Sequence, residues 1–144
     1  MKDGYIKVAA GSVPVAVADI EHNKREILAR MQEADTLGVN LLVLPELCLT
    51  GYSCGDLFFS DALLDAAWRA AGEIVRATMS VYPIVVFGLP VRRGGRLYNC
   101  AAVAAQGKLL GLVPKTHLPG FGEFSEPRHF ASAAMLDGIV TTSA

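Results

Sequence analysis

Residues 41–44 read Leu-Leu-Val-Leu and are followed at once by Pro45 and Glu46. Such an unbroken apolar run is typical of a fully buried strand, and a proline ends the hydrogen-bond ladder of that strand. Glu46 is therefore predicted to lie just beyond the carboxyl end of a strand. Ligands of α/β proteins bind in the crevice outside those ends, which favours a functional carboxylate. The pattern leaves open that Glu46 only caps a helix or solvates a loop.

The flanking sequence predicts a strand and helix rhythm. Residues 5–15 predict a first strand that ends near Pro14, and apolar residues at helical spacing predict helices over 20–37 and 62–78. An apolar run at 84–89 predicts a further buried strand. Alternation of this kind is typical of βαβ units with parallel strands.

The rhythm changes after Pro90. Tight turns at 94–95 and 106–107 separate strands that the pattern predicts over 97–105 and 108–113. The sequence therefore predicts an antiparallel meander joined to a parallel sheet, with the two long helices on one side of it.

Lys115 stands at its strand end as Glu46 does, because Pro114 ends the strand and the charged residue follows. A carboxylate and an ammonium group brought together at strand ends suit amide hydrolysis. The carboxylate takes the proton of a nucleophile and returns it to the leaving ammonia, and the ammonium group stabilises the oxyanion.

The composition narrows the classes of function. With 144 residues, 52% of them hydrophobic and 19% charged, the chain is predicted to form one globular domain over residues 1–144. A formal net charge of −1 gives no electrostatic reason to expect nucleic acid or an anionic membrane as a partner. No apolar run approaches the roughly 20 residues of a membrane span, and no signal segment is evident, so a cytoplasmic protein is expected.

Short motifs carry a resemblance to a known family. They are Leu-Pro-Glu at 44–46, Thr-Gly-Tyr at 50–52, Pro-Lys at 114–115 and Leu-Pro at 118–119. Together they resemble the nitrilase or carbon–nitrogen hydrolase superfamily. The fuller stretches 46–58 and 115–130 are similar to the amino-terminal glutaminase domain of the glutamine-dependent NAD synthetases, and the resemblance covers about residues 5–130.

This resemblance implies a nitrilase-type α-β-β-α sandwich, of which residues 1–144 would form the first half or so. By motif position it implies that Glu46 is the general base and Lys115 the oxyanion stabiliser. Glu123 would be a second carboxylate that orients Lys115 or the substrate amide. Tyr52 would lie beside the site, and Phe121 stands where the family usually has a tyrosine that holds glutamine.

The resemblance also implies partners. Glutamine would be the substrate, and its ammonia would pass to a carboxy-terminal synthetase domain that uses ATP and magnesium to amidate nicotinic acid adenine dinucleotide. No cofactor or metal is expected in residues 1–144 themselves. The nucleophilic cysteine of the family lies well beyond the lysine motif, and the sequence has no cysteine after Cys100. Because Cys48, Cys54 and Cys100 are expected to be passive buried thiols, the chain alone is expected to be inactive.

Two other interpretations remain open. One is a part of a stand-alone nitrilase-superfamily amidase, and the other is a non-catalytic remnant that serves as an interaction module. An incomplete sandwich leaves apolar strand faces uncovered, so a homo-oligomer is expected.

Overall fold

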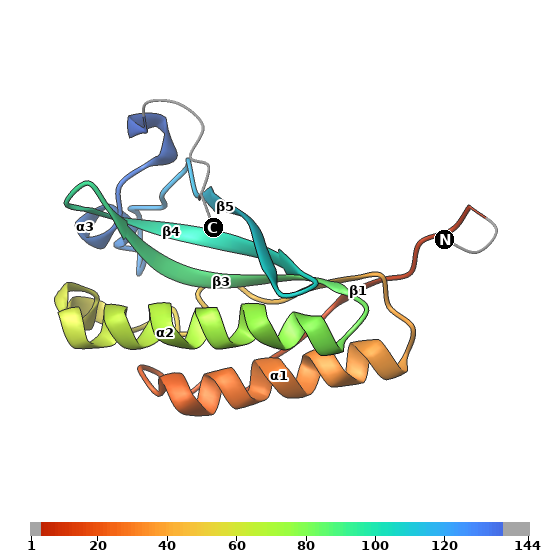
Figure 1. The fold of residues 1–144 in the computed structure, drawn as a ribbon. Helices are drawn as coiled ribbons and strands as arrows, with labels where there is room; N and C mark the ends of the chain where they lie inside the picture. The colour runs from red at the N-terminus through yellow and green to blue at the C-terminus, as the bar shows by residue number, and fades with distance from the viewer. Residues whose placement is uncertain (1–3, 137–144) are drawn as a thin grey trace.

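The computed structural model describes residues 4–136. Its centre is a five-stranded sheet with the strand order β1-β2-β3-β4-β5 (Figure 1). The strands are β1 (Val8–Ala10), β2 (Leu41–Val43), β3 (Ile84–Arg93), β4 (Arg96–Ala105) and β5 (Lys108–Pro114). The pairs β1–β2 and β2–β3 are parallel, and β3–β4 and β4–β5 are antiparallel. The predicted mixed sheet is therefore confirmed.

Two long helices cover one face of this sheet (Figure 1). They are α1 (Ile20–Thr36) and α2 (Asp61–Ala77), and each agrees with its predicted range to within one residue at either end. The side chain of Asp19 accepts a hydrogen bond from the His22 N–H and caps α1. Gly38, with φ of 67°, follows the end of α1 in the left-handed conformation that glycine adopts freely.

The shorter elements follow the long helices and the sheet. They are the 3₁₀-helices η1 (Gly55–Phe59), η2 (Thr78–Ser80) and η3 (Ala133–Met135), and the short helix α3 (Glu126–His129). Of these, η1 and α3 contact each other. No helix within residues 4–136 combines the length and the apolar character that crossing a bilayer requires.

The hydrophobic core lies between the helices and the sheet. Along β3, the side chains of Val85, Phe87 and Leu89 are fully buried, and Ile27 of α1 and Ile74 of α2 are buried as deeply. Alternate residues of a strand point to opposite faces, so this one strand places its large side chains on the helix side. Burial of these side chains is the main source of the stability of the fold.

The first strand is shorter than the predicted range 5–15. At its start, the Lys7 N–H binds the side chain of Asn40, so the ladder with β2 begins only at Val8. Beyond Gly11, whose N–H still binds the Val43 carbonyl, the chain leaves the sheet. The prediction for this strand was wrong in length at both ends, since the side chain of Asn40 takes the Lys7 N–H and the last backbone bond to the β2 segment is that of Gly11.

The strand β3 is longer than the predicted range 84–89 and continues through Pro90 to Arg93. Its parallel neighbour β2 pairs with it only as far as Val86. Beyond that point β4 is the only strand that pairs with β3, and on the other side the Leu49 N–H binds the Gly88 carbonyl before Pro90 is reached. An edge strand tolerates a proline, since the missing N–H leaves no partner unpaired on the open side.

The face of the sheet opposite α1 and α2 is apolar, and neither long helix covers it (Figure 1). Val8, Val43 and Ile84 project from this face, and all three are at least 40% exposed. Val113 of β5 is 59% exposed on the same face. A continuous apolar surface of this kind is typical of a face that is covered by another layer.

We expect purified residues 1–144 to associate through this face. Replacing both Val8 and Val113 with lysine places charges on it and should shift the protein toward monomer. Leu37→Lys is the control, since Leu37 is 55% exposed at the end of α1, away from the sheet. Light scattering measures the association state. A wild-type protein that is a monodisperse, cooperatively unfolding monomer contradicts the expectation.

Candidate active site

The segment that follows β2 crosses over β3 at Gly88. A Cβ atom on Gly88 would lie 2.2 Å from the Leu47 nitrogen and 2.8 Å from the Pro45 oxygen. Leu47 itself has a φ of 49°, which is uncommon for a bulky residue and costs of the order of 1–3 kcal/mol. The missing side chain of Gly88 therefore allows the backbone that carries Glu46 to pass directly over the sheet.

This crossing brings Glu46 to the neighbouring strands. The Lys115 Nζ donates to Oε1 of Glu46 at 2.7 Å, and the side chain of Asn99 in β4 donates to the same oxygen. The strand β5 runs parallel to β2 and β3, so Lys115 and Glu46 follow carboxyl ends at the same edge of the sheet. The structure thus brings together the two charged residues that the sequence singled out.

A second carboxylate approaches Lys115 from α3. Oε1 of Glu126 accepts hydrogen bonds from the Lys115 Nζ at 2.8 Å and from the Tyr52 hydroxyl at 2.7 Å. Glu126 is only 4% exposed, and its Oε2 is buried without a hydrogen-bond partner among the described residues. A single ammonium group therefore lies between two carboxylates.

The charges of this cluster set its protonation. Partial burial lowers the pKa of Lys115, but its hydrogen bonds and ion pairs with Glu126 and Glu46 outweigh that effect and raise the pKa above its usual value. Lys115 therefore stays an ammonium group at neutral pH. Burial, together with the hydrogen bond to Glu126, raises the pKa of Tyr52 well above its usual range, so Tyr52 stays a hydrogen-bond donor.

Glu123 was predicted to orient Lys115 or the substrate amide, and in the structure the second glutamate that contacts Lys115 is Glu126. Glu123 lies exposed in the loop before α3 and forms no ion pair with Lys115. The turn in which the Phe124 N–H binds the Phe121 carbonyl, followed by the one-turn helix, directs Glu126 inward. Motif position alone does not reveal this difference of three residues.

Aromatic rings line the approach to Glu126. The rings of Tyr52 and Phe124 lie 6.2 Å apart, edge to face, and those of Phe124 and Phe121 lie 5.7 Å apart. Phe121 is 71% exposed. The structure places both predicted substrate-binding residues, Tyr52 and Phe121, in one row that leads outward from the charged cluster.

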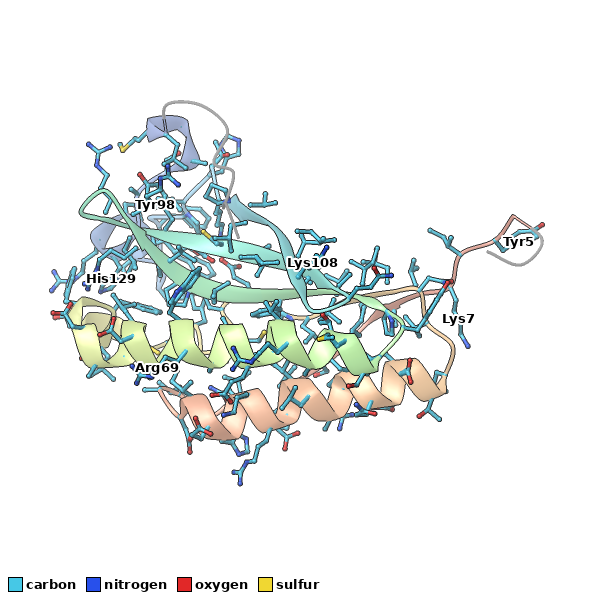
Figure 2. All side chains as sticks on the ribbon, viewed as in Figure 1. Tyr5, Lys7, Arg69, Tyr98, Lys108 and His129 are labelled. Atoms are coloured by element: carbon cyan, nitrogen blue, oxygen red, sulfur yellow. The ribbon has the colours of Figure 1, made fainter. Side chains whose placement is uncertain are left out.

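A second link ties α3 to the loop that carries Tyr52. The Arg128 guanidinium donates two hydrogen bonds to Asp56 of η1, at 3.0 and 2.9 Å, and the His129 ring contacts the same carboxylate at 3.2 Å. The hydrogen bonds from Arg128, and to a smaller extent the one with His129, lower the pKa of Asp56 to about 2. Figure 2 shows His129 at the end of the molecule opposite Tyr5 and Lys7. The bidentate geometry fixes the orientation of α3 beside the site.

The three cysteines of the sequence take no part in the charged cluster, although Cys100 is among the residues that line the pocket beside it. Cys48, Cys54 and Cys100 are all buried, and burial raises the pKa of each thiol, to about 11 for Cys48 and about 12 for Cys100. None of these thiols forms a hydrogen bond with Lys115 or with either glutamate. They are therefore poor nucleophiles at neutral pH.

A concave pocket opens beside the cluster on the uncovered face of the sheet. It has a volume of about 340 Å³, and Glu46, Asn99, Lys115 and Gly88 form part of its lining. A carboxylate, an ammonium group and an amide donor converge on this space, a combination of groups that suits the cleavage of an amide. Residues 4–136 contain no group of three or more His, Cys, Asp or Glu side chains arranged to hold a metal ion.

Sequence reasoning missed two residues of this cluster, Asn99 and Glu126. Asn99 stands between Tyr98 and Cys100 in an apolar strand, and a buried polar side chain in such a strand requires a partner. That signal could have found it. Glu126 had no signal that distinguished it from Glu123.

The chain is similar to known proteins both in sequence and in fold. A family model described as carbon–nitrogen hydrolase matches residues 7–139. A curated relative from Mycobacterium tuberculosis, named glutamine-dependent NAD(+) synthetase, is 38% identical over 128 residues, which are 89% of this chain and 19% of the relative. The chain therefore spans about a fifth of the length of the curated relatives of this kind.

Solved structures show the same fold. That of a glutamine-dependent NAD(+) synthetase from Cytophaga hutchinsonii matches 88% of this chain and 22% of its own, with 35% identity and a TM-score of 0.84. An amidase from Nesterenkonia sp. matches 89% of this chain and 48% of its own, with 24% identity and a TM-score of 0.74. The amidase shows a shared fold only.

We expect Gly88→Ala to displace the turn that carries Glu46. The added methyl group cannot occupy a position 2.2 Å from a backbone nitrogen, so the turn must move, at a cost of about 1–3 kcal/mol of unfolding free energy. Thermal unfolding measures this loss, and a crystal structure of the variant should show the Glu46–Lys115 contact broken.

Gly111→Ala is the matched control, because a Cβ atom on Gly111 of β5 would meet nothing within 4 Å. Its stability should stay within about 0.5 kcal/mol of the wild type, as for most innocuous substitutions. If the two variants unfold alike and both keep the Glu46–Lys115 contact, close packing at Gly88 does not hold the turn.

Proposed function

The chain belongs to the carbon–nitrogen hydrolase family, and on that premise we propose that it forms part of a glutaminase site that releases ammonia from the side-chain amide of glutamine. The observation that carries the proposal is the Lys115 ammonium group held between Glu46 and Glu126 beside an open pocket. The names of the relatives from Mycobacterium tuberculosis and Cytophaga hutchinsonii support glutamine as the substrate.

In this proposal Glu46 is the general base. It is half-exposed at the pocket, so it can take the proton of a nucleophilic cysteine thiol and later give it to the leaving ammonia. Lys115 faces the oxygen of the tetrahedral intermediate and stabilises its negative charge. Glu126 keeps Lys115 charged, and Tyr52 holds Glu126 in place.

The nucleophile is not one of the three cysteines of this sequence. Their burial and raised pKa values support that assignment, since the reactive form of a cysteine is the thiolate. The thiol that attacks the amide would therefore come from sequence beyond this chain. The position of the pocket on the uncovered face of the sheet leaves room for it.

The ammonia would serve a synthetase. We infer from the names of the relatives that it passes to a synthetase domain that makes NAD. The resemblance of the sequence to this family implies that such a domain would use ATP and magnesium to amidate nicotinic acid adenine dinucleotide. That domain would be the partner of this chain and glutamine its substrate. A stand-alone amidase is the weaker candidate, because the similarity to the solved amidase is limited to the fold.

Purified residues 1–144 should release no ammonia from glutamine above the rate without protein. A base and an oxyanion stabiliser without a nucleophile cannot form the acyl-enzyme. A coupled ammonia assay measures the rate, with an active glutaminase as the positive control. Turnover that disappears in Cys48→Ser or Cys54→Ser would refute the passive role of these thiols.

In the longer protein that carries this sequence with its nucleophile, Glu46→Gln and Lys115→Ala should each lower glutamine-dependent turnover by about 10²-fold or more. Synthesis that is driven by free ammonia should survive both changes, because ammonia bypasses the glutaminase site. Parallel assays with glutamine and with ammonia check this.

The matched pair Glu126→Gln and Glu123→Gln tests which glutamate supports Lys115. Glu126→Gln should reduce glutamine-dependent turnover strongly, and Glu123→Gln should leave it nearly unchanged, since of these two glutamates only Glu126 contacts Lys115.

One outcome of the Glu46→Gln assays would end the proposal. If this variant loses the ammonia-driven and the glutamine-driven reactions equally, Glu46 is a structural residue.

A further inference from the structure

Asn99 forms hydrogen bonds with both Lys115 and Glu46, with its backbone to the first and its side chain to the second. Its backbone carbonyl accepts the Lys115 N–H at 2.8 Å, which fixes the start of the segment after β5. Its side-chain amide donates to Oε1 of Glu46. A carboxylate only accepts hydrogen bonds, so the amide must present its NH₂ group and not its oxygen to Glu46.

The two oxygens of Glu46 are therefore unequal. Oε1 accepts from both the Asn99 amide and the Lys115 Nζ, the latter at 2.7 Å. Oε2 forms no hydrogen bond with the residues that the structure describes, and the Glu46 side chain is 43% exposed beside the pocket. One oxygen is occupied by two donors, and the other is free for a ligand.

We propose that Asn99 is a positioning residue, which holds Oε1 of Glu46 and so leaves Oε2 as the oxygen that takes the proton of the nucleophile. This inference rests on the proposed glutaminase function. In the step it describes, the proton moves from the cysteine thiol to Oε2, the sulfur forms its bond to the amide carbon, and the carbonyl π electrons move to the oxygen that faces Lys115. The electron pair on that oxygen then re-forms the carbonyl, the carbon–nitrogen bond breaks, and the nitrogen takes the proton from Oε2 and leaves as ammonia, so a thioester remains.

Within the described residues, the Asn99 side chain forms no hydrogen bond other than the one to Glu46. The bond from Lys115 to its backbone would form with any residue at this position. Asn99 is only 4% exposed, and a buried amide in an apolar strand costs more than an apolar side chain unless its hydrogen bonds are made. The contact with the base is thus the physical reason for an asparagine here.

The experiment compares Asn99→Leu and Asn99→Asp in the longer protein that carries this sequence with its nucleophile. Leucine keeps the approximate volume and removes the donor, whereas aspartate keeps the shape and turns the donor into an acceptor. Both keep the backbone bond to Lys115. A hydrogen bond to a charged group is worth a factor of about 10 to 100, so kcat for glutamine should fall by that factor while KM changes less than about 3-fold. A merely structural residue would not produce this split.

Tyr98→Phe is the matched control, because Tyr98 is the preceding residue of β4, equally buried at 4%, packs in the core and does not line the pocket. It should keep the wild-type kcat. Thermal unfolding of all variants identifies any that do not fold, and a crystal structure of Asn99→Asp should show the Glu46 carboxylate turned away from its present orientation.

The outcomes separate this inference from the proposed function. If Glu46→Gln is inactive and both Asn99 variants keep the wild-type kcat, Asn99 does not position the base, and the glutaminase proposal stands. If the Asn99 variants raise KM and keep kcat, Asn99 binds substrate and the inference is wrong. If Glu46→Gln keeps full glutamine-dependent turnover, the proposed function itself is wrong.

Discussion

The close contact between the Pro45–Leu47 backbone and Gly88 is the constraint on which the rest of the site depends. The strands β2 and β5 are separated by two other strands, so a residue after β2 reaches the end of β5 only if the chain crosses the sheet. With any side chain at Gly88 that path is blocked. The left-handed conformation of Leu47 indicates that the turn is strained and is kept in place by its surroundings.

Once Glu46 has reached the end of β5, ion pairs and hydrogen bonds fix the positions of the other residues of the charged cluster. A buried carboxylate such as Glu126 is costly without a partner, and Lys115 supplies one. Each of the two glutamates also accepts one neutral donor, Asn99 for Glu46 and Tyr52 for Glu126. The resulting cluster keeps a charged ammonium group next to a carboxylate that remains open to the pocket. In the proposed glutaminase site these two groups would be the oxyanion stabiliser and the base.

Much of this fold could be predicted from local patterns. The apolar runs and the helical spacing predicted the mixed sheet and both long helices, and the prolines after two strands predicted that Glu46 and Lys115 would lie close together. The exceptions depend on tertiary contacts. The strand β3 passes through Pro90 because β2 ends beside it, and Glu126 replaces Glu123 because a single helical turn sets which glutamate points inward. No pattern within one segment reports either contact.

The most direct test of the glutaminase assignment is a crystal structure of this chain with glutamine bound, since the amide should remain intact without a nucleophile. The account predicts the carboxamide oxygen at about 3 Å from the Lys115 Nζ, with the amide beside Oε2 of Glu46 and the rest of the molecule along Tyr52. Glutamine bound away from Lys115, with the cluster of Lys115 and its two glutamates unchanged, would contradict it.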